Sequence, residues 1–317
     1  MFTDDLVFKV DGRDLTDKEL KKVTIFILEL SRVWRRIIYR GENEENLKRK
    51  LNINSTENIF ERLSYFIFMV GDKARAYHLQ NRDSIINEGN IYPIDSLDQD
   101  VFYMIFDKFY NVFHTSTNRE NIDFREYNHD FATFFQNMEN RNIFLNKVLE
   151  IQNDHDKLIV RDYYLSLLHK IGKVGLHYTS LFVSTTLDKE VSDHFAKVNV
   201  NSEKSITFVG WFARKASGNS LIKRYSLPVY NRGIYLNQKE ISMKGGILPH
   251  YLLGYIVHST NEFFINPNFF TTNKEISSIV KDGLDIDQTN FIEILRQTNY
   301  TGYITLDGDE NWRDYRL

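Results

Sequence analysis

The sequence predicts an α+β fold, in which a mainly helical first half precedes a mainly antiparallel β second half. From about residue 46 to residue 173, apolar residues recur at the three- and four-residue steps that are typical of one helix face. After Gly175 the chain changes to short β-branched and aromatic runs separated by Gly, Asn, Ser and Pro. A late helix at about 274–297 and a last strand in YTGYITLD are expected to complete the fold.

Composition favours one compact body. Of the 317 residues, 42% are hydrophobic and 14% aromatic, which is ample for a buried core. With four prolines and no Pro-, Gly- or Ser-rich linker, we expect a single domain over 1–317, with 46–173 as a mainly helical insertion. A net charge of −3 does not suggest a protein held on nucleic acid by bulk charge. The absence of cysteine excludes disulfides, thiolate nucleophiles and thiolate metal sites.

Neither export nor membrane insertion is expected. The start, MFTDDLVFKV, lacks a basic segment followed by an apolar run, so it does not read as a secretory signal. No run of about 18 apolar residues is present, and the most apolar stretch, YFIFMVG, is predicted to be buried helix. We therefore expect a cytoplasmic protein with no membrane partner.

The first elements follow from local signals. Thr16 to Glu19 fits a capping box, and apolar residues then mark one helix face, at Leu20, Val23, Ile27, Leu30 and Trp34. A short strand at Ile37 to Tyr39 is expected to end at Gly41. The insertion contains three amphipathic segments, whose many Phe and Tyr are predicted to form a core: ENIFERLSYFIFMVGDKARAYHL, DQDVFYMIFDKFYNVFH and YNHDFATFFQNMENRNIFLNKVLEIQ.

Strands are expected in the second half of the chain. The runs that predict them are LHYTSLFVSTT, SITFVGWFARKA, RYSLPVY, RGIYLNQKEISM and YLLGYIVHS. No zinc site is expected, because the sequence has no H-E-x-x-H, and His250 and His258 lie in a strand-like region without acidic neighbours. Neither G-x-x-x-x-G-K-[ST] nor G-x-G-x-x-G is present, so the common phosphate-binding loops are absent too.

Three motifs remain that could carry chemistry. Tyr39-Arg40-Gly41-Glu42 lies at the expected strand end, and Ser184-Thr185-Thr186 lies where a strand passes into an amphipathic helix. Gln238-Lys239-Glu240 opens a strand, after a loop that contains Tyr235. Thr186 is expected to cap the helix that follows, since a hydroxyl oxygen accepts from the free N–H groups of a first turn. The other hydroxyls then need another role.

In this order, the motifs resemble the ADP-ribosyltransferases of the Arg–Ser–Glu type. In that family a strand-end Arg, a Ser-Thr-Ser-like strand end followed by a helix, and a Glu/Gln-x-Glu pair surround bound NAD. The best match is FVSTTLDKEVSDHFA. Tyr39-Arg40-Gly41 with HYTSLFVSTTLDKEVSDHFA also resembles the bacterial FRG domain, more loosely. The resemblance implies a split antiparallel β core with an N-terminal helix and a large helical insertion.

One spacing departs from the family. Arg40 lies 144 positions before Ser184 (184 − 40), longer than the family's usual gap, and the helical insertion would account for it. A rival arginine, Arg125 in IDFREY, lies 59 positions before Ser184 (184 − 125). Arg40 is preferred because it ends a plausible strand and precedes Gly, but the choice stays open. Glu240 lies 56 positions after Ser184 (240 − 184), which suits the family.

The resemblance assigns a role to each residue. Cleavage of the nicotinamide–ribose bond leaves an oxocarbenium-like sugar, which the carboxylate of Glu240 would stabilise more than the ground state. Ser184 would orient Glu240 by a hydrogen bond, and Arg40 would grip a phosphate of NAD. Tyr235 would stack on nicotinamide or on the acceptor. The remaining NAD-binding positions would be Tyr39, Gly41, Thr185 and Thr186.

Gln238 indicates which chemical class of acceptor would be modified. Two residues before Glu240 on an extended segment, it would point the same way as Glu240, and its amide both donates and accepts. In the family, Gln here accompanies amide or nucleic-acid base acceptors, whereas Glu accompanies arginine. The resemblance thus implies a mono-ADP-ribosyltransferase with NAD as co-substrate and no metal, which modifies a nucleic-acid base or a protein side chain, with arginine disfavoured.

A potentially lethal activity without an export signal suggests a toxin or an effector in conflict between bacteria and phages, such as anti-phage defence. An antitoxin or another regulatory protein would then be a partner. Two alternatives remain open. In one, the same pocket passes the sugar to water, as an NAD glycohydrolase that depletes NAD. In the other, the chain is a non-enzymatic helical interaction protein whose hydroxyls only cap helices.

Overall fold

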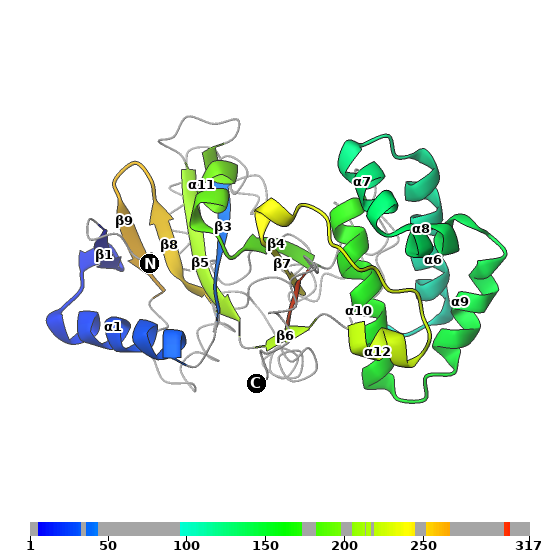
Figure 1. The fold of residues 1–317 in the computed structure, drawn as a ribbon. Coiled ribbons are helices and arrows are strands. Elements are labelled where there is room, and N and C mark those ends of the chain that lie inside the picture. The colour runs from blue at the N-terminus through cyan, green and yellow to red at the C-terminus, as the bar shows by residue number, and fades with distance from the viewer. Residues whose placement is uncertain are drawn as a thin grey trace. The chain divides into compact units, whose positions relative to one another are not determined.

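The chain folds into a mixed α/β structure, which agrees with the predicted α+β class (Figure 1). The computed structural model describes residues 6–32, 36–43, 96–172, 182–197, 205–212, 214–216, 219–244, 252–266 and 301–304. The chain divides into two compact units. The first comprises Met1–Arg82, Val183–Arg214 and Met243–Gly302, and the second comprises Asp83–Phe182, Lys215–Ser242 and Tyr303–Leu317.

The first unit is built on a mixed sheet, in which neighbouring strands follow the order β2-β1-β9-β8-β5-β3-β4. The strands are β1 (Val7–Val10), β2 (Arg13–Asp14), β3 (Arg36–Asn43), β4 (Phe182–Thr186), β5 (Ser205–Phe212), β8 (Leu252–Val257) and β9 (Glu262–Ile265). β1 runs parallel to β9, whereas the other neighbours pair antiparallel. β3 and β5 pair along their whole length, from Arg36 opposite Phe212 to Asn43 opposite Ser205.

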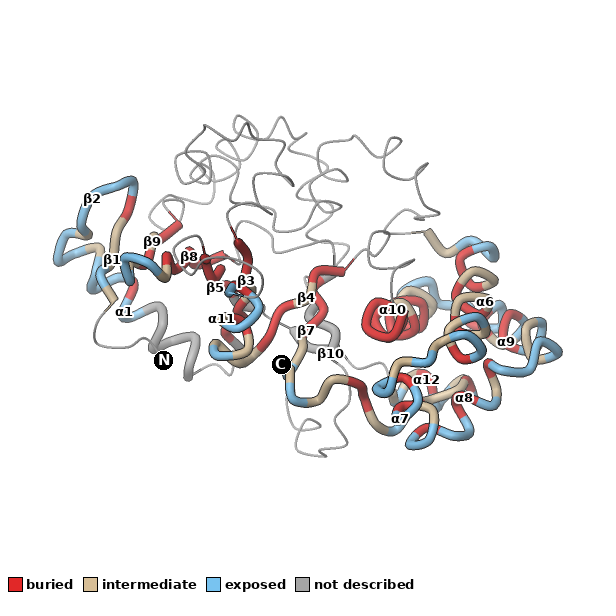
Figure 2. Tube along the Cα trace, turned by 90° about the horizontal axis from the view of Figure 1, so that it is seen from above, coloured by how far each residue is buried: buried red, intermediate tan, exposed pale blue. Residues whose placement is uncertain are grey.

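One buried apolar cluster of the first unit lies on one face of this sheet. Because side chains alternate along a strand, Ile37, Tyr39 and Gly41 of β3 share that face, and Arg40 and Glu42 share the other. The buried cluster on the first face is Val23, Ile37, Tyr39, Val209, Leu253, Ile256, Phe263 and Ile265. All six residues of β8 are buried, as Figure 2 shows in red, so both faces of this strand are covered.

The first helix, α1 (Asp17–Arg32), begins at the predicted capping box. The N–H of Glu19 donates to Thr16 Oγ1 at 3.4 Å, and the N–H of Thr16 donates to Glu19 Oε2 at 2.9 Å. A hydrogen bond from Arg13 is the main reason that the pKa of Glu19 is lowered to about 2. Val23 is buried as expected, but Leu20 is 40% exposed, so only part of the expected face packs on the sheet. The side chains of Ile27, Leu30 and Trp34 lie outside the described residues.

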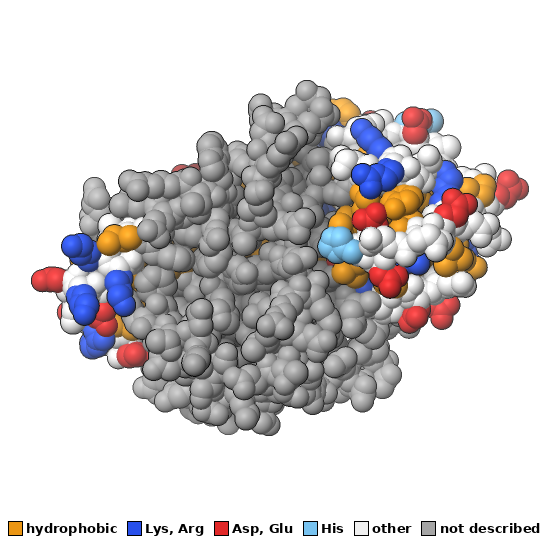
Figure 3. Space-filling model, turned by 90° about the horizontal axis from the view of Figure 1, so that it is seen from below, with side chains coloured by type: hydrophobic (Ala, Val, Ile, Leu, Met, Phe, Trp, Pro, Cys, Tyr) orange, Lys and Arg blue, Asp and Glu red, His pale blue; other side chains and the backbone are white. Residues whose placement is uncertain are grey.

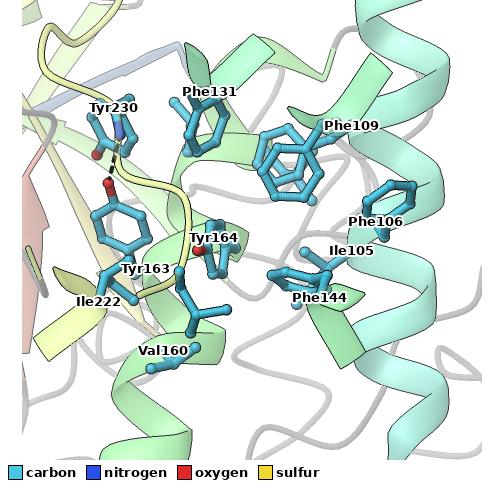
Figure 4. Packing of buried hydrophobic residues seen from close by; sticks show 14 of the residues in the cluster. Ile105, Phe106, Phe109, Phe131, Phe144, Val160, Tyr163, Tyr164, Ile222 and Tyr230 are labelled. Carbon is cyan, nitrogen blue, oxygen red and sulfur yellow. Dashed lines mark hydrogen bonds between the residues drawn. The ribbon is translucent and has the colours of Figure 1, made fainter. Parts of the chain in front are cut away.

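The second unit is mainly helical. Its helices are α6 (Gln99–Thr115), α7 (Arg119–Tyr127), α8 (His129–Gln136), α9 (Asn140–Leu149), α10 (Asp154–Ile171) and α12 (Asn219–Arg224). Their core is largely aromatic, as predicted (Figure 4). The ring centroid of Phe109 lies 4.6 Å from that of Phe135 and 6.1 Å from that of Tyr164. Offset and edge-to-face contacts of this kind stabilise a core beyond the area that they bury.

The segment 225–239 is not the β structure that RYSLPVY and RGIYLNQKEISM predict. It contains a short 3-10 helix, η2 (Leu236–Gln238), and extended pairing begins only at β7 (Glu240–Lys244). Helix side chains bind the main chain of this segment in place of a partner strand. Tyr164 donates to the oxygen of Pro228 at 2.8 Å. The N–H of Tyr230 donates to the Tyr163 hydroxyl at 3.1 Å, as the dashed line in Figure 4 shows.

Asn128 also binds the main chain of this segment, at Asn231 and Arg232. Its Oδ1 accepts from the N–H groups of Asn231 at 2.7 Å and Arg232 at 3.0 Å, while Nδ2 donates to the oxygen of Arg232 at 2.9 Å. Aromatic and β-branched residues here therefore serve the helical core, in which Leu227, Tyr230 and Ile234 are buried. Tertiary packing has overridden β propensity in this segment.

Among the described strands, four have residues in both units: β4, of which only Phe182 belongs to the second unit, β6 (Arg214–Ala216), β7 and β10 (Thr301–Ile304). β10 lies within the predicted last strand, YTGYITLD. The expected late helix at 274–297 and the first amphipathic segment of the insertion, with YFIFMVG, lie outside the described residues. Among the helices that the structure describes, none combines the length and apolar character needed to cross a membrane.

Candidate functional site

Arg40 and Gly41 lie within β3 rather than at its end, so the prediction that Gly41 ends the strand is wrong. Gly41 instead allows helix α11 (Lys189–Lys197) to pack closely on β3 (Figure 1). A Cβ at position 41 would lie 2.0 Å from the main-chain oxygen of Ser192 and 2.6 Å from the nitrogen of Ala196. Only a residue without a side chain permits that approach.

The guanidinium of Arg40 joins the first motif to the second. Its Nη1 donates to the main-chain oxygen of Ser184 at 2.7 Å, across 144 residues of sequence. Its Nε and Nη2 donate to Glu42 Oε1 at 3.0 Å and 2.5 Å. The side chain of Glu42 is 5% exposed and that of Arg40 is 21% exposed. Arg40 is thus held by a buried carboxylate and by the backbone of β4, while part of its guanidinium side chain stays accessible.

The second motif is a strand followed by a helix, as predicted, but its cap differs. Thr186 Oγ1 accepts from the N–H of Asp188 at 2.9 Å, and Asp188 Oδ1 accepts from the N–H of Glu190 at 3.0 Å. Asp188 is therefore the N-cap of α11, and the expectation that Thr186 caps the helix is wrong. A carboxylate at this place also complements the positive end of the helix dipole, which a hydroxyl cannot do. Thr185 and Thr186 are buried, and Ser184 is half-buried.

A polar cluster that the sequence did not suggest fastens α11 to the sheet. Asp193 Oδ1 accepts from the hydroxyl of Thr207 at 2.8 Å, and His258 Nε2 lies 2.9 Å from that hydroxyl and 3.4 Å from Asp193 Oδ1. His258 therefore has an acidic neighbour after all, brought from a distant helix. Within the described residues, no three His, Cys, Asp or Glu come together as a metal would require.

The proton positions in this cluster follow from its geometry. A hydroxyl has a single hydrogen, and that of Thr207 donates to Asp193, so the tautomer of His258 that fits this arrangement carries its proton on Nε2 and donates to Thr207. A nucleophile activated by a histidine needs the opposite arrangement, with the carboxylate on the far ring nitrogen. The cluster is thus a structural clamp and not a catalytic triad.

Burial is the main cause that lowers the pKa of His258 from 6.5, although the charge of Asp193 acts to raise it. Burial also raises the pKa of Tyr39 to about 12, with smaller contributions from Asp193 and Asp188. Tyr39 is thus a protonated phenol on the face that α11 covers. Arg40, the next residue of β3, lies on the other face of the sheet.

The third motif departs from the expected extended segment. Gln238 ends the 3-10 helix η2, and Lys239 has φ 45°, in the left-handed region. The argument that Gln238 and Glu240 point the same way along a strand is therefore wrong, because only Glu240 belongs to β7. Tyr235, just before η2, also has a positive φ of 56°. Left-handed residues other than glycine are uncommon, and they cluster at functional sites.

Glu240 lies among polar side chains of the second unit. Ser242 Oγ donates to Glu240 Oε1 at 3.0 Å, and His169 Nε2 lies 3.8 Å from the same oxygen. Burial lowers the pKa of Lys170, and the charge of Glu240 opposes that shift. Burial raises the pKa of Tyr235, and a smaller contribution in the same direction comes from Glu240. The nearly buried carboxylate of Glu240 thus has a hydroxyl and an imidazole within 4 Å, and it interacts through its charge with Lys170 and Tyr235.

The predicted site residues fall into two sets. Tyr39, Arg40, Gly41, Ser184, Thr185 and Thr186 belong to the first unit, and Tyr235, Gln238 and Glu240 to the second. Within the second unit, the hydroxyl that binds Glu240 is that of Ser242. Sequence reasoning missed Ser242, His169 and Lys170. Ser242 follows Glu240 at the two-residue period of a strand, which was the one available signal, whereas α10 supplies the others from 70 residues away.

Arg125, the alternative candidate for the NAD-binding arginine, has a structural role. Arg125 Nη1 donates to the oxygen of Phe113, and Nη2 donates to the oxygen of Ser116 at 3.3 Å. These carbonyls lie at the end of α6, where main-chain oxygens lack partners within the helix. A cation there also complements the negative end of the helix dipole. The geometry accounts for Arg125 without a ligand.

The surface of the second unit mixes charges. On the face seen in Figure 3, basic, acidic and hydrophobic side chains of this unit are interspersed. Two arginines lie on aromatic rings: Arg141 over Tyr103 at 4.0 Å and Arg232 over Tyr127 at 3.7 Å. The described residues on this face therefore do not produce the one-sign field by which bulk charge attracts nucleic acid.

No family model matches this chain, and comparisons with curated proteins and with solved structures find no match either. The likeness to the Arg–Ser–Glu transferases therefore rests on the three sequence motifs.

Proposed function

We propose that this chain is a mono-ADP-ribosyltransferase, which uses NAD to modify a nucleic-acid base or a protein side chain other than arginine. The observation that carries the proposal is the 2.7 Å hydrogen bond from Arg40 to the backbone of Ser184. The resemblance requires the strand with the arginine to lie beside the strand with the hydroxyls. Tyr39 pairs with Thr186 in adjacent antiparallel strands, which supports that requirement.

In this function Arg40 binds a phosphate of NAD. A guanidinium is permanently charged and presents donors in a planar fork, which suits a phosphate. The bond to Ser184 and the pair with Glu42 fix its plane before NAD arrives, so little conformational entropy is lost on binding. The ADP-ribosyltransferase-like fold and the split β core that the resemblance implies belong to the same proposal.

Glu240 acts on the ribose. The bond between C1′ and the nicotinamide nitrogen breaks, and its electron pair leaves with nicotinamide. The acceptor then forms a new bond to C1′ and loses a proton. The carboxylate of Glu240 stabilises the positive sugar between these events, and the hydroxyl of Ser242 holds Oε1 in place. In this proposal Tyr235 stacks on nicotinamide or the acceptor, and Gln238 contacts the acceptor.

The test uses NAD labelled in its adenylate, a cell lysate, and the purified protein beside its Glu240→Gln variant. Glu139→Gln, an exposed change in the same unit, is the matched control. Label that requires Glu240 and disappears with nuclease or with protease supports the transferase and gives the acceptor class. Nicotinamide release without label supports an NAD glycohydrolase instead. Neither product, or equal label with Glu240→Gln, overturns the proposal and favours a non-enzymatic interaction protein.

The proposed biological role is that of a toxin or phage-conflict effector held in check by an antitoxin or another regulatory protein. Expression in a bacterial host should then arrest growth, because an unchecked transferase modifies its acceptor and consumes NAD. Glu240→Gln should abolish the arrest at equal protein level, whereas Glu139→Gln should leave it unchanged. Arrest by both variants would assign the toxicity to something other than this chemistry.

A further inference from the structure

The last turn of α10 carries two buried basic residues that interact with Glu240, His169 at a short distance and Lys170 through its charge. His169 and Lys170 are 7% and 8% exposed, and the helix ends at Ile171. His169 Nε2 lies 3.8 Å from Glu240 Oε1, which is an ion-pair distance rather than a hydrogen bond. The whole arrangement, including Ser242, lies within the second unit. The proposed function assigns no task to either basic residue.

Burying these groups costs free energy unless they compensate one another. An isolated ammonium is expensive to remove from water, and a buried one is retained only when it is paired. The end of a helix favours a cation, and so does the charge of Glu240, whereas burial lowers the pKa of Lys170. Glu240 brings the opposite charge. The three side chains are therefore interdependent, because removing the carboxylate leaves the basic groups without its compensation.

The geometry also restricts the carboxylate. Ser242 Oγ approaches Oε1 from β7 itself, and His169 approaches the same oxygen from α10. Two elements of the unit thus hold one oxygen of Glu240, which limits rotation of the carboxylate plane. A carboxylate that must face a developing positive charge benefits from such a fixed orientation, because no reorganisation is then needed during the reaction.

We propose that His169 and Lys170 are positioning residues, which hold the Glu240 carboxylate in the orientation and the charged surroundings that the reaction of NAD requires. This inference rests on the proposed function, since it concerns the residue that faces the ribose. Neither basic residue contacts substrate. Both act through Glu240, and α10 becomes part of the catalytic support rather than a packing element alone.

The first test separates positioning from binding. His169→Gln and Lys170→Met should each lower kcat for NAD cleavage about 10- to 100-fold, since a small misplacement of a reacting group has that effect. The KM for NAD should change less than about threefold, because ground-state binding is kept. Lys170→Arg should restore part of kcat. His155→Gln, an exposed change in the first turn of α10, is the matched control and should behave as the parent protein.

The second test needs no activity. A thermal double-mutant cycle compares Glu240→Gln, Lys170→Met and the double variant. Glu240→Gln alone should lower Tm, because Lys170 loses its compensating charge, and the double variant should recover part of the loss. If Lys170→Met does not fold, the same cycle with His169→Gln replaces it. Additive Tm changes in the cycle that folds would overturn the coupling.

The two proposals fail in different ways. If Glu240→Gln keeps the NAD chemistry, the proposed function is wrong, whatever the thermal cycle gives. If Glu240→Gln is inactive while His169→Gln and Lys170→Met retain parental kcat, the function stands and the positioning role is wrong. A raised KM with unchanged kcat would place His169 and Lys170 in binding and would equally overturn this inference.

Discussion

The main-chain oxygen of Ser192 lies 2.0 Å from the position that a Cβ would take at Gly41. Helix α11 therefore rests directly on the backbone of β3. Since α11 follows the Ser184-Thr185-Thr186 motif in the chain, this contact also fixes the helix of the second motif against the strand of the first. The glycine is a packing requirement, although the sequence alone presents it as the end of a strand.

Gly41→Ala should therefore destabilise the protein by at least about 2 kcal/mol, because a methyl group meets main-chain atoms that cannot rotate away. Ser192→Ala is the control, because it changes the facing residue but leaves its main-chain oxygen in place. The hydroxyl of Ser192 is buried without a hydrogen-bond partner among the described residues, so its removal should change stability by less than about 0.5 kcal/mol. Denaturant unfolding measures both variants, and equal stability of Gly41→Ala and the parent would contradict the close approach.

The two candidate arginines should respond differently to lysine. If the proposed function holds, Arg40→Lys should raise the KM for NAD about tenfold, because lysine lacks the planar fork that spans Ser184, Glu42 and a phosphate. Arg125→Lys should leave the KM unchanged, since Arg125 binds the end of α6. Steady-state kinetics decides between them. If only Arg125→Lys raised the KM for NAD, the NAD-binding role would belong to Arg125.

The clamp around His258 should make stability depend on pH. Burial places the pKa of His258 below its ordinary 6.5, so the unfolded chain takes up this proton first as the pH falls. The contribution is fully present above pH 6.5 and is lost progressively as the pH falls from there to the lower folded pKa. Asp193 opposes the shift, whereas Lys189 and Lys197 increase it.

His258→Gln tests this dependence, because glutamine can donate to Thr207 without titrating. Unfolding free energies measured from pH 8 to pH 5.5 should fall less steeply for the variant than for the parent protein. Identical slopes would show that the imidazole does not change its proton affinity on folding.

Asn128 should contribute more to the stability of the fold than an ordinary loop residue. It is 2% exposed, and its amide binds the main chain of Asn231 and Arg232 ahead of Tyr235. Asn128→Ala should cost about 2 kcal/mol, since backbone groups lose their partner in a buried place. Asn137→Ala removes one hydrogen bond, from the N–H of Glu139, on an exposed turn and should cost less than about 1 kcal/mol. Similar losses for the two would contradict the assignment.

Local signals predicted a good part of this fold. The capping box at Thr16, the aromatic helical core and the strand-to-helix passage after Ser184 depend on residues close in sequence, and the structure has all three. RYSLPVY shows the limit of such signals. Its residues suit a strand, but its main chain binds the side chains of Tyr163 and Tyr164, and no local pattern predicts partners about 65 residues away.

The candidate site, like the fold, was predicted from the sequence only in part. The sequence by itself determined the α+β class and the residue types of the three motifs, since periodicity, capping and strand signals act between near neighbours in the chain. Only the tertiary structure decided that Gly41 admits α11, that Arg40 binds the backbone of Ser184, and that His169 and Lys170 interact with Glu240. These contacts join residues 70 to about 150 positions apart, and burial and hydrogen bonding between such residues exist only once the chain has folded.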